Sequence, residues 1–366
     1  MSTRSAVLIN VQTARLFAAM LVVIHHTNHE AIDNGIANIG TMRFTRLIDG
    51  SLGVDIFFVI SGLIMILTSG SRFGSKANAW EFLKRRLSRI APLYWLFTAL
   101  MVVALVAVPS GLNHHVPSVW QVVASLLFIP TTDTVGVIQP VLGVGWTLNY
   151  EMLFYVVFAV AMLWRRAIGI PLVFATLLAL ILVGHVVPAG TSDLLSFWSN
   201  PITIEFLFGI LLGIGLERGQ RLGMATTVAL AVVGLALLWL ASAAGWIDPP
   251  LRWLAVGLPA TMIVAAAALG PQPAQSPPVR LLRLGGDASY ALYLSHPFTI
   301  NVVAAIWKRS PPAGSVEFVV VAALVSLGVG VLVHLLVERP LLDLLHRRPV
   351  ALMDHPLLLR LRRGSR

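Results

Sequence analysis

The feature that most constrains this chain is the repeated occurrence of apolar stretches close to 20 residues long. A helix needs roughly 20 mostly apolar residues to cross a bilayer. Ten stretches approach that length: about 7–28, 50–70, 91–109, 146–164, 167–187, 202–217, 224–243, 252–270, 285–307 and 315–337. Hydrophobic residues make up 57% of the chain and charged residues 11%, against roughly 25% charged in soluble domains. We therefore predict an all-α integral membrane protein with about ten transmembrane helices.

A further apolar stretch, near 119–130, is too short to cross the bilayer, and we predict a half-helix there. The basic residues then predict the orientation. With the N-terminus in the cytoplasm, 20 of the 26 lysine and arginine residues fall in cytoplasmic segments and five fall outside. This bias follows the positive-inside rule, so we expect both termini in the cytoplasm. We expect residues 1–345 to form one transmembrane domain and residues 346–366 a basic cytoplasmic tail.

Other compositional features exclude several classes of protein. The net charge of +10 is explained by membrane orientation, and we expect no nucleic-acid partner. The chain has no cysteine, which excludes disulfides and thiolate chemistry. We expect no metal ion. The first apolar stretch holds Arg15 and a histidine pair, so we interpret it as a retained helix and not as a cleaved signal peptide.

Arg15 and His26 are the first candidates for function, because an ionisable group at bilayer depth costs at least a few kcal/mol. They are eleven residues apart, which places them on one helix face and roughly 16 Å apart along the axis. Arg15 suits the phosphates of a large anionic ligand. His26, near the outer end, suits general-base catalysis on a hydroxyl. The alternatives are a snorkelling arginine and an interfacial histidine.

Two carboxylates lie in later spans. Asp55 stands near the outer end of the second span, where it can pair with His26 or hold its tautomer, and an interfacial carboxylate is the alternative. Glu151 lies about one turn inside the outer surface, where it must pair or stay protonated. We favour a role for Glu151 near the outer site over a structural ion pair.

The densest basic cluster stands beside the cytoplasmic end of the third span. Positive-inside orientation explains any one of its charges, but four charges within six residues can also hold phosphates. The residues that we predict to bind an anionic cofactor here are Arg85, Arg86, Arg89 and the nearby Tyr94.

The ninth span carries a polar stripe. Ser289, Tyr293 and His296 follow one another at i, i+4 and i+7, which places them on one helix face. With Trp146, they are candidates for binding substrate or stabilising an oxyanion.

These segments together resemble the membrane-bound acyltransferase type 3 family. The resemblance spans residues 8–340 and rests on Arg15 with His26 and on the runs SLGVDIFFVISG, KRRLSRIAPLYW, WTLNYEMLFY, GDASYALYLSHP and VERP. Each run alone is a weak signal, but their order and topology are specific. The chain differs from many relatives in its histidine pair and in Trp-Thr-Leu-Asn-Tyr-Glu, where they have Trp-Ser-Leu and a double glutamate. It looks most like the exopolysaccharide-production branch.

The resemblance implies ten helices with cytoplasmic termini, in a bacterial inner-membrane protein. It implies an acyl donor, usually acetyl-CoA, that enters from the cytoplasm, and a carbohydrate or lipid acceptor outside. The essential arginine and histidine of the family correspond to Arg15 and His26. Its tryptophan-to-glutamate motif corresponds to Trp146 and Glu151, and its arginine-rich loop to the region of Arg85 and Arg89.

The sequence therefore predicts an O-acyltransferase that moves an acetyl group from cytoplasmic acetyl-CoA to a hydroxyl of an exopolysaccharide or glycolipid. The alternative is a transporter or flippase of a polysaccharide precursor, although no internal repeat of the kind common in transporters is evident. A non-catalytic assembly partner would leave Arg15, His26 and Glu151 unexplained. The acyl group, the acceptor hydroxyl and the choice between monomer and homodimer are not specified by the sequence.

Overall fold

The structure, a computed structural model, describes residues 8–37, 49–70, 72–107, 116–188, 190–247, 251–309 and 314–346. These residues form helices, apart from loops and one isolated β-bridge between Thr132 and Ile138. The α-helices are α1 (Ile9–Asp33), α2 (Gly53–Ser69), α3 (Lys76–Ala107), α4 (Val119–Leu126), α5 (Trp146–Ala161), α6 (Arg166–Val186), α7 (Asp193–Trp198), α8 (Ile204–Glu217), α9 (Met224–Ala244), α10 (Leu258–Leu269), α11 (Pro277–Asp287), α12 (Ser289–Trp307), α13 (Ser315–Val333) and α14 (Arg339–His346). Short π-helical turns, Trp253–Gly257 and His334–Glu338, precede α10 and α14. The predicted tail lies outside the described residues, apart from His346.

The all-helical membrane character is confirmed. Within the described ranges, six helical stretches are long and apolar enough to cross a membrane: Gly50–Ser69, Lys76–Ala107, Gly143–Ala161, Arg166–Val186, Met224–Ala244 and Ser315–Leu345. The other four predicted spans are helical as α1, α8, α10 and α12, but they are shorter or carry more polar side chains. A count of ten crossings and the cytoplasmic termini therefore stay predictions.

Two boundaries refine the expectations from sequence. The third span does not begin near residue 91, because α3 extends back to Lys76 and includes the basic cluster that we expected in a loop. The predicted half-helix is α4, which begins at Val119 and ends at Leu126. Phe128 follows it with a positive φ of 59°, a conformation that stops a helix, and its ring stacks on Tyr94 of α3 at 5.0 Å between centroids.

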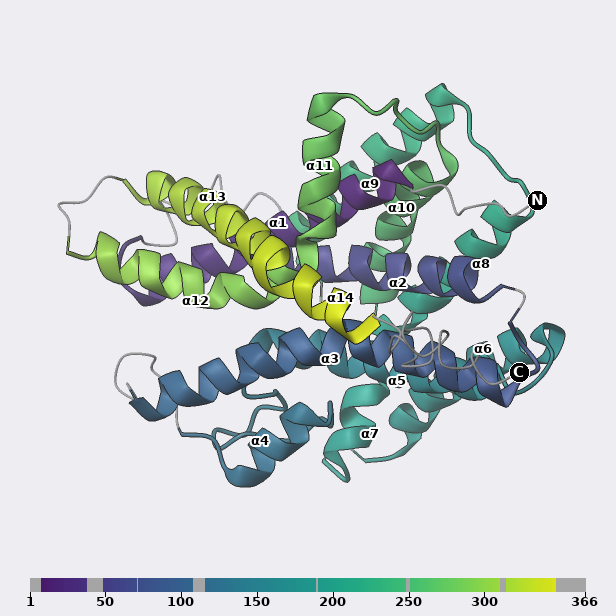
Figure 1. Cartoon of the computed structure of the whole chain (residues 1–366), viewed down its shortest axis with the longest axis horizontal. Helices are drawn as coiled ribbons and strands as arrows, with labels where there is room; N and C mark the ends of the chain where they lie inside the picture. The colour runs from purple at the N-terminus through teal and green to yellow at the C-terminus, as the bar shows by residue number, and fades with distance from the viewer. Residues whose placement is uncertain are drawn as a thin grey trace, which may run out of the picture.

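Helix α2 lies in the centre of the bundle, with α3 and α5 on one side and α9 and α10 on the other (Figure 1). It crosses α8 where Gly62 faces Gly209. A Cβ atom on Gly62 would lie 2.0 Å from the backbone oxygen of Phe206, so the two backbones can approach only because both residues lack a side chain. Close packing of this kind is typical of membrane helices. The hydrophobic effect does not drive helices together inside a bilayer, and small residues let the backbones approach closely enough for van der Waals contact.

Helix α1 is held at both ends. Near its start, Gly286 of α11 packs against it so closely that a Cβ atom there would lie 2.2 Å from the oxygen of Gln12. Near its end, His25 Nδ1 lies 3.0 Å from Asp49, whose carboxylate also accepts a hydrogen bond from the Ser51 N–H. Burial alone would raise the pKa of Asp49, but these hydrogen bonds outweigh it and hold the pKa below its usual value. These contacts fix the positions of Arg15 and His26 relative to α2 and α12.

Candidate functional site

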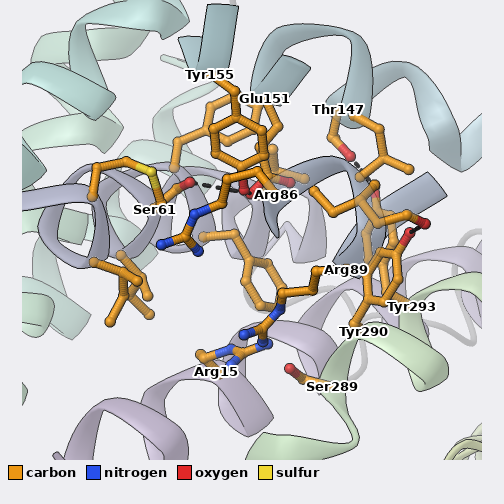
Figure 2. A pocket seen from close by; sticks show the side chains of 18 of the residues that line it. Arg15, Ser61, Arg86, Arg89, Thr147, Glu151, Tyr155, Ser289, Tyr290 and Tyr293 are labelled. Carbon is orange, nitrogen blue, oxygen red and sulfur yellow. Dashed lines mark hydrogen bonds between the residues drawn. The ribbon is translucent and has the colours of Figure 1, made fainter. Parts of the chain in front are cut away.

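A cavity of about 190 Å³ opens between α1, α2, α3, α5 and α12. Figure 2 shows three arginines around it, with Ser61, Glu151 and Tyr155 on one side and Ser289, Tyr290 and Tyr293 on another. Apolar side chains of α2, including Val54, Phe57 and Met65, form the remaining wall. The cavity therefore joins a cationic region to an apolar one.

The cationic wall consists of Arg15 from α1 and Arg86 and Arg89 from α3, one helical turn apart. Arg15 donates to Gln12 at 3.2 Å, and Arg86 donates to Thr68 at 2.6 Å and lies over the rings of Phe82 and Tyr155. Arg89 is the most exposed of the three. None of them takes part in an ion pair with another described residue. Three guanidinium groups without a carboxylate partner at ion-pair distance make a site suited to phosphate groups.

Glu151 is the carboxylate of the cavity. Its Oε1 atom accepts a hydrogen bond from Ser61 of α2 at 3.1 Å and another from Tyr155, one turn further along α5. From the sequence we expected Glu151 to act near the outer site. The structure places Glu151 and Ser61 in the cavity with the arginines.

The polar stripe of α12 is divided between the cavity and a second cluster. Ser289 and Tyr293 line the cavity, and the Ser289 hydroxyl is buried without a hydrogen-bond partner in the described part of the chain. The Tyr293 hydroxyl donates to the backbone oxygen of Val144 at 2.8 Å and lies 3.0 Å from the Thr147 hydroxyl. Since its proton is already used, Tyr293 is not poised in this structure to stabilise an oxyanion. His296 lies behind Tyr293, with 5.9 Å between their ring centroids.

His26 lies beyond the cavity, next to His296. Their rings are 5.0 Å apart, and His296 is completely buried. The Nδ1 atom of His26 is 2.9 Å from the backbone oxygen of Val22. A carbonyl oxygen only accepts, so Nδ1 is the protonated nitrogen, and when the ring is neutral the lone pair is at Nε2. That lone pair is what a general base or a nucleophile requires.

Asp55 is not paired with His26. Its buried carboxylate is bound by Arg252, at 3.0 Å from Nε and 2.6 Å from Nη2. An arginine that forms two parallel hydrogen bonds is a stronger partner than an imidazole, which explains why the pairing expected from sequence does not form. Glu205 of α8 is fully buried near this ion pair.

Three other predicted site residues lie outside the cavity. Arg85 points to the surface and pairs with Glu81 at 2.7 Å. Tyr94 is fully buried against Phe128. Trp146 is half-buried with its ring edge-on to Tyr150 at 5.9 Å. The neighbours of two of these, Arg86 and Thr147, line the cavity instead, because a shift of one position turns a helical side chain by about 100°.

Several cavity residues carried no signal in the sequence. These residues are Gln12, Thr147, Tyr155 and Tyr290, and nothing in the spacing of Gln12, Thr147 or Tyr290 distinguishes them. Tyr155 lies four residues after Glu151, and this i, i+4 spacing was the one usable clue.

The fold and the cavity define a polytopic membrane protein with an arginine-lined pocket among its helices. Comparison with known proteins gives the class more closely: a family model described as an acyltransferase domain matches residues 8–335. The chain belongs to the membrane-bound acyltransferase type 3 family, as the resemblance of its motifs indicated.

Two curated relatives are similar along most of their length. The exopolysaccharide production protein ExoZ of Rhizobium meliloti is 36% identical over 80% of this chain and 90% of its own. The acyltransferase MdmB of Streptomyces mycarofaciens is 27% identical over 93% of this chain and 94% of its own. No solved structure matches the chain.

Proposed function

We propose that this protein is an acyl-CoA-dependent O-acyltransferase. It transfers an acyl group, which we propose is acetyl, to a hydroxyl of an extracytoplasmic carbohydrate such as an exopolysaccharide. The observation that carries the proposal is the position of Arg15 and His26 on one helix. Arg15 lies in a cavity with two further arginines, and His26 lies beyond it with its Nδ1 2.9 Å from the backbone oxygen of Val22, which leaves Nε2 free for the reaction. The family and the names of the two relatives support acyl transfer and a polysaccharide acceptor.

The proposed topology has ten crossings, made by the six long apolar helices together with α1, α8, α10 and α12, in the bacterial inner membrane. Both termini face the cytoplasm, with residues 1–345 as the transmembrane domain and 346–366 as the tail. Arg15, Arg86 and Arg89 then lie toward the cytoplasm, where acyl-CoA is available, and His26 lies toward the outer surface. The positive-inside bias supports this orientation.

In the proposed reaction, Arg15, Arg86 and Arg89 hold the phosphates of the donor. The thioester carbon reaches His26, whose Nε2 takes the proton of the acceptor hydroxyl as its oxygen bonds to that carbon. The carbon–sulfur bond breaks, and the CoA thiolate leaves and takes up a proton. The same lone pair can instead attack the thioester to give an acyl-histidine, which the acceptor then resolves to the same products.

The test is incubation of the purified, reconstituted protein with labelled acetyl-CoA, with free CoA as the readout. We expect CoA release by the wild type and its loss in His26→Ala. The matched control is His25→Ala, because His25 is the neighbouring histidine but pairs with Asp49. Near-normal release by His26→Ala would exclude the mechanism. Bound CoA without turnover would indicate a missing acceptor, while movement of a precursor without acylated product would identify a flippase.

A further inference from the structure

The two oxygens of Glu151 differ in their surroundings. Ser61 and Tyr155 both donate to Oε1, whereas no hydrogen bond or ion pair to Oε2 is found within the described ranges. Glu151 is half-buried and lines the cavity. One oxygen therefore fixes the side chain between α2 and α5, and the other is left as an acceptor for a ligand.

An ionised carboxylate only accepts hydrogen bonds. A ligand that fills this cavity must therefore bring anionic or acceptor groups to the arginines and a hydrogen-bond donor to Glu151. A fatty acyl chain offers neither the anionic groups nor the donor.

An acyl donor with a pantetheine arm meets both requirements. Its phosphates suit Arg86 and Arg89, and the amide N–H groups of the arm lie between the phosphates and the thioester. Arg89 is the most exposed of the three cavity arginines, while Tyr155, which donates to Glu151, is buried. The order along the cavity, from exposed arginine to carboxylate, matches the order along the donor from phosphate to amide.

We propose that Glu151 Oε2 accepts a hydrogen bond from an amide N–H of the acyl donor, and that this bond makes the cavity selective for thioesters that carry an amide near the sulfur. The inference rests on the proposed function, because it concerns the donor of that reaction. It assigns Glu151 to donor binding, on the cavity side, and not to the acceptor hydroxyl beside His26. Ser61 and Tyr155 are positioning residues that aim the free oxygen.

The experiment compares S-acetyl-N-acetylcysteamine with a matched thioester in which an ester oxygen replaces the N–H. Each is measured by turnover, and by competition against labelled acetyl-CoA so that a poor substrate still gives a value. A hydrogen bond to a charged group corresponds to roughly a 10- to 100-fold preference. We expect the wild type to prefer the amide by about that factor, and Glu151→Ala to show little preference.

Ser61→Ala is the matched control, because it removes a donor to Oε1 and leaves Oε2 in place, so most of the preference should remain. An equal preference for the amide in wild type and Glu151→Ala would overturn the inference. It would also be overturned if Glu151→Ala weakened only the binding of the acceptor and left the binding of both thioesters unchanged. If thermal melting shows that Glu151→Ala does not fold, Glu151→Leu replaces it, because leucine has a similar size and no hydrogen-bond acceptor, and an unchanged preference there overturns the inference equally.

The two hypotheses fail in different ways. A wild type that neither binds nor uses acetyl-CoA would overturn the proposed function, and the inference with it. Normal acetyl-CoA turnover that depends on His26, together with equal use of both small thioesters, would overturn only the role of Glu151.

Discussion

Arg252 binds Asp55 through two hydrogen bonds, 3.0 Å from Nε to Oδ1 and 2.6 Å from Nη2 to Oδ2, and so joins the segment before α10 to the N-terminal end of α2. The Asp55 side chain is fully buried. Breaking a buried pair leaves one charge without a partner and costs about 3–5 kcal/mol. We therefore expect Arg252→Ala to lower the melting temperature of the protein in detergent strongly. If Asp55 were instead a catalytic residue, Arg252→Ala would lower turnover and leave the melting temperature nearly unchanged.

Arg252→Lys should recover only part of the stability, because an ammonium group cannot form the planar fork. The matched control is Arg283→Ala. Arg283 forms an exposed pair with Asp287 at 3.7 Å, and such pairs contribute about 0–1 kcal/mol. Equal losses from Arg252→Ala and Arg283→Ala would contradict the assignment.

The second prediction separates two adjacent arginines of α3. Arg86 lines the cavity, whereas Arg85 is exposed and paired with Glu81. If Arg86 contacts donor phosphates, losing a charge-assisted hydrogen bond corresponds to about a tenfold or greater rise in KM for acetyl-CoA. Arg86→Gln should show that rise and Arg85→Gln should change KM less than about threefold. Steady-state kinetics on both variants measures it, and similar KM values would count against the cationic wall as the donor site.

The sequence identifies candidate residues of this site better than it identifies the residues that they contact. Intramembrane charge alone identifies Arg15, Asp55 and Glu151, because such residues are costly and need a partner. It does not say which partner. Asp55 binds Arg252, 197 residues away along the chain, and only the packing of α2 against α10 brings the two together.

Helical phase explains the other differences. The cluster of Arg85, Arg86 and Arg89 was evident as a cluster, but which members face inward depends on the rotation of α3. That rotation is set by contacts with α5 and α12 that a single sequence does not reveal. The number of spans is also not settled by the sequence, because α8 has only 14 residues and α12 carries polar side chains such as Ser289, Ser295 and His296.

The third prediction concerns the crossing of α2 and α8. A Cβ atom on Gly62 would lie 2.0 Å from the backbone oxygen of Phe206 and 3.0 Å from the Cα atom of Gly209, so Gly62→Ala must push the helices apart. Overpacking of this kind costs roughly 1–3 kcal/mol. Gly328→Ala is the control, because nothing lies within 4 Å of its Cβ position in α13. We expect a lower melting temperature for Gly62→Ala alone, and equal behaviour of the two variants would contradict the close approach.

The last prediction concerns pH. Asp49 joins the C-terminal half of α1 to the segment before α2 through His25, at 3.0 Å, and through the Ser51 N–H, at 2.8 Å. Burial alone would raise the pKa of Asp49. These hydrogen bonds lower it by more than burial raises it, so in the folded protein the pKa of Asp49 lies below the usual value near 3.9. The stabilisation is therefore fully present above about pH 4 and is lost as the pH falls toward the lowered value. Because the Asp49 side chain is partly exposed to solvent, we expect these contacts to contribute about 1 kcal/mol to the free energy of unfolding.

The Asp49→Asn variant should have a lower melting temperature than the wild type from pH 5 to 8, and the difference between the two should shrink below pH 4. His25→Ala should lower the melting temperature by a similar amount near neutral pH. The double variant should be little less stable than Asp49→Asn alone, because both changes remove the same contact. A difference between wild type and Asp49→Asn that grows at acid pH would contradict the prediction.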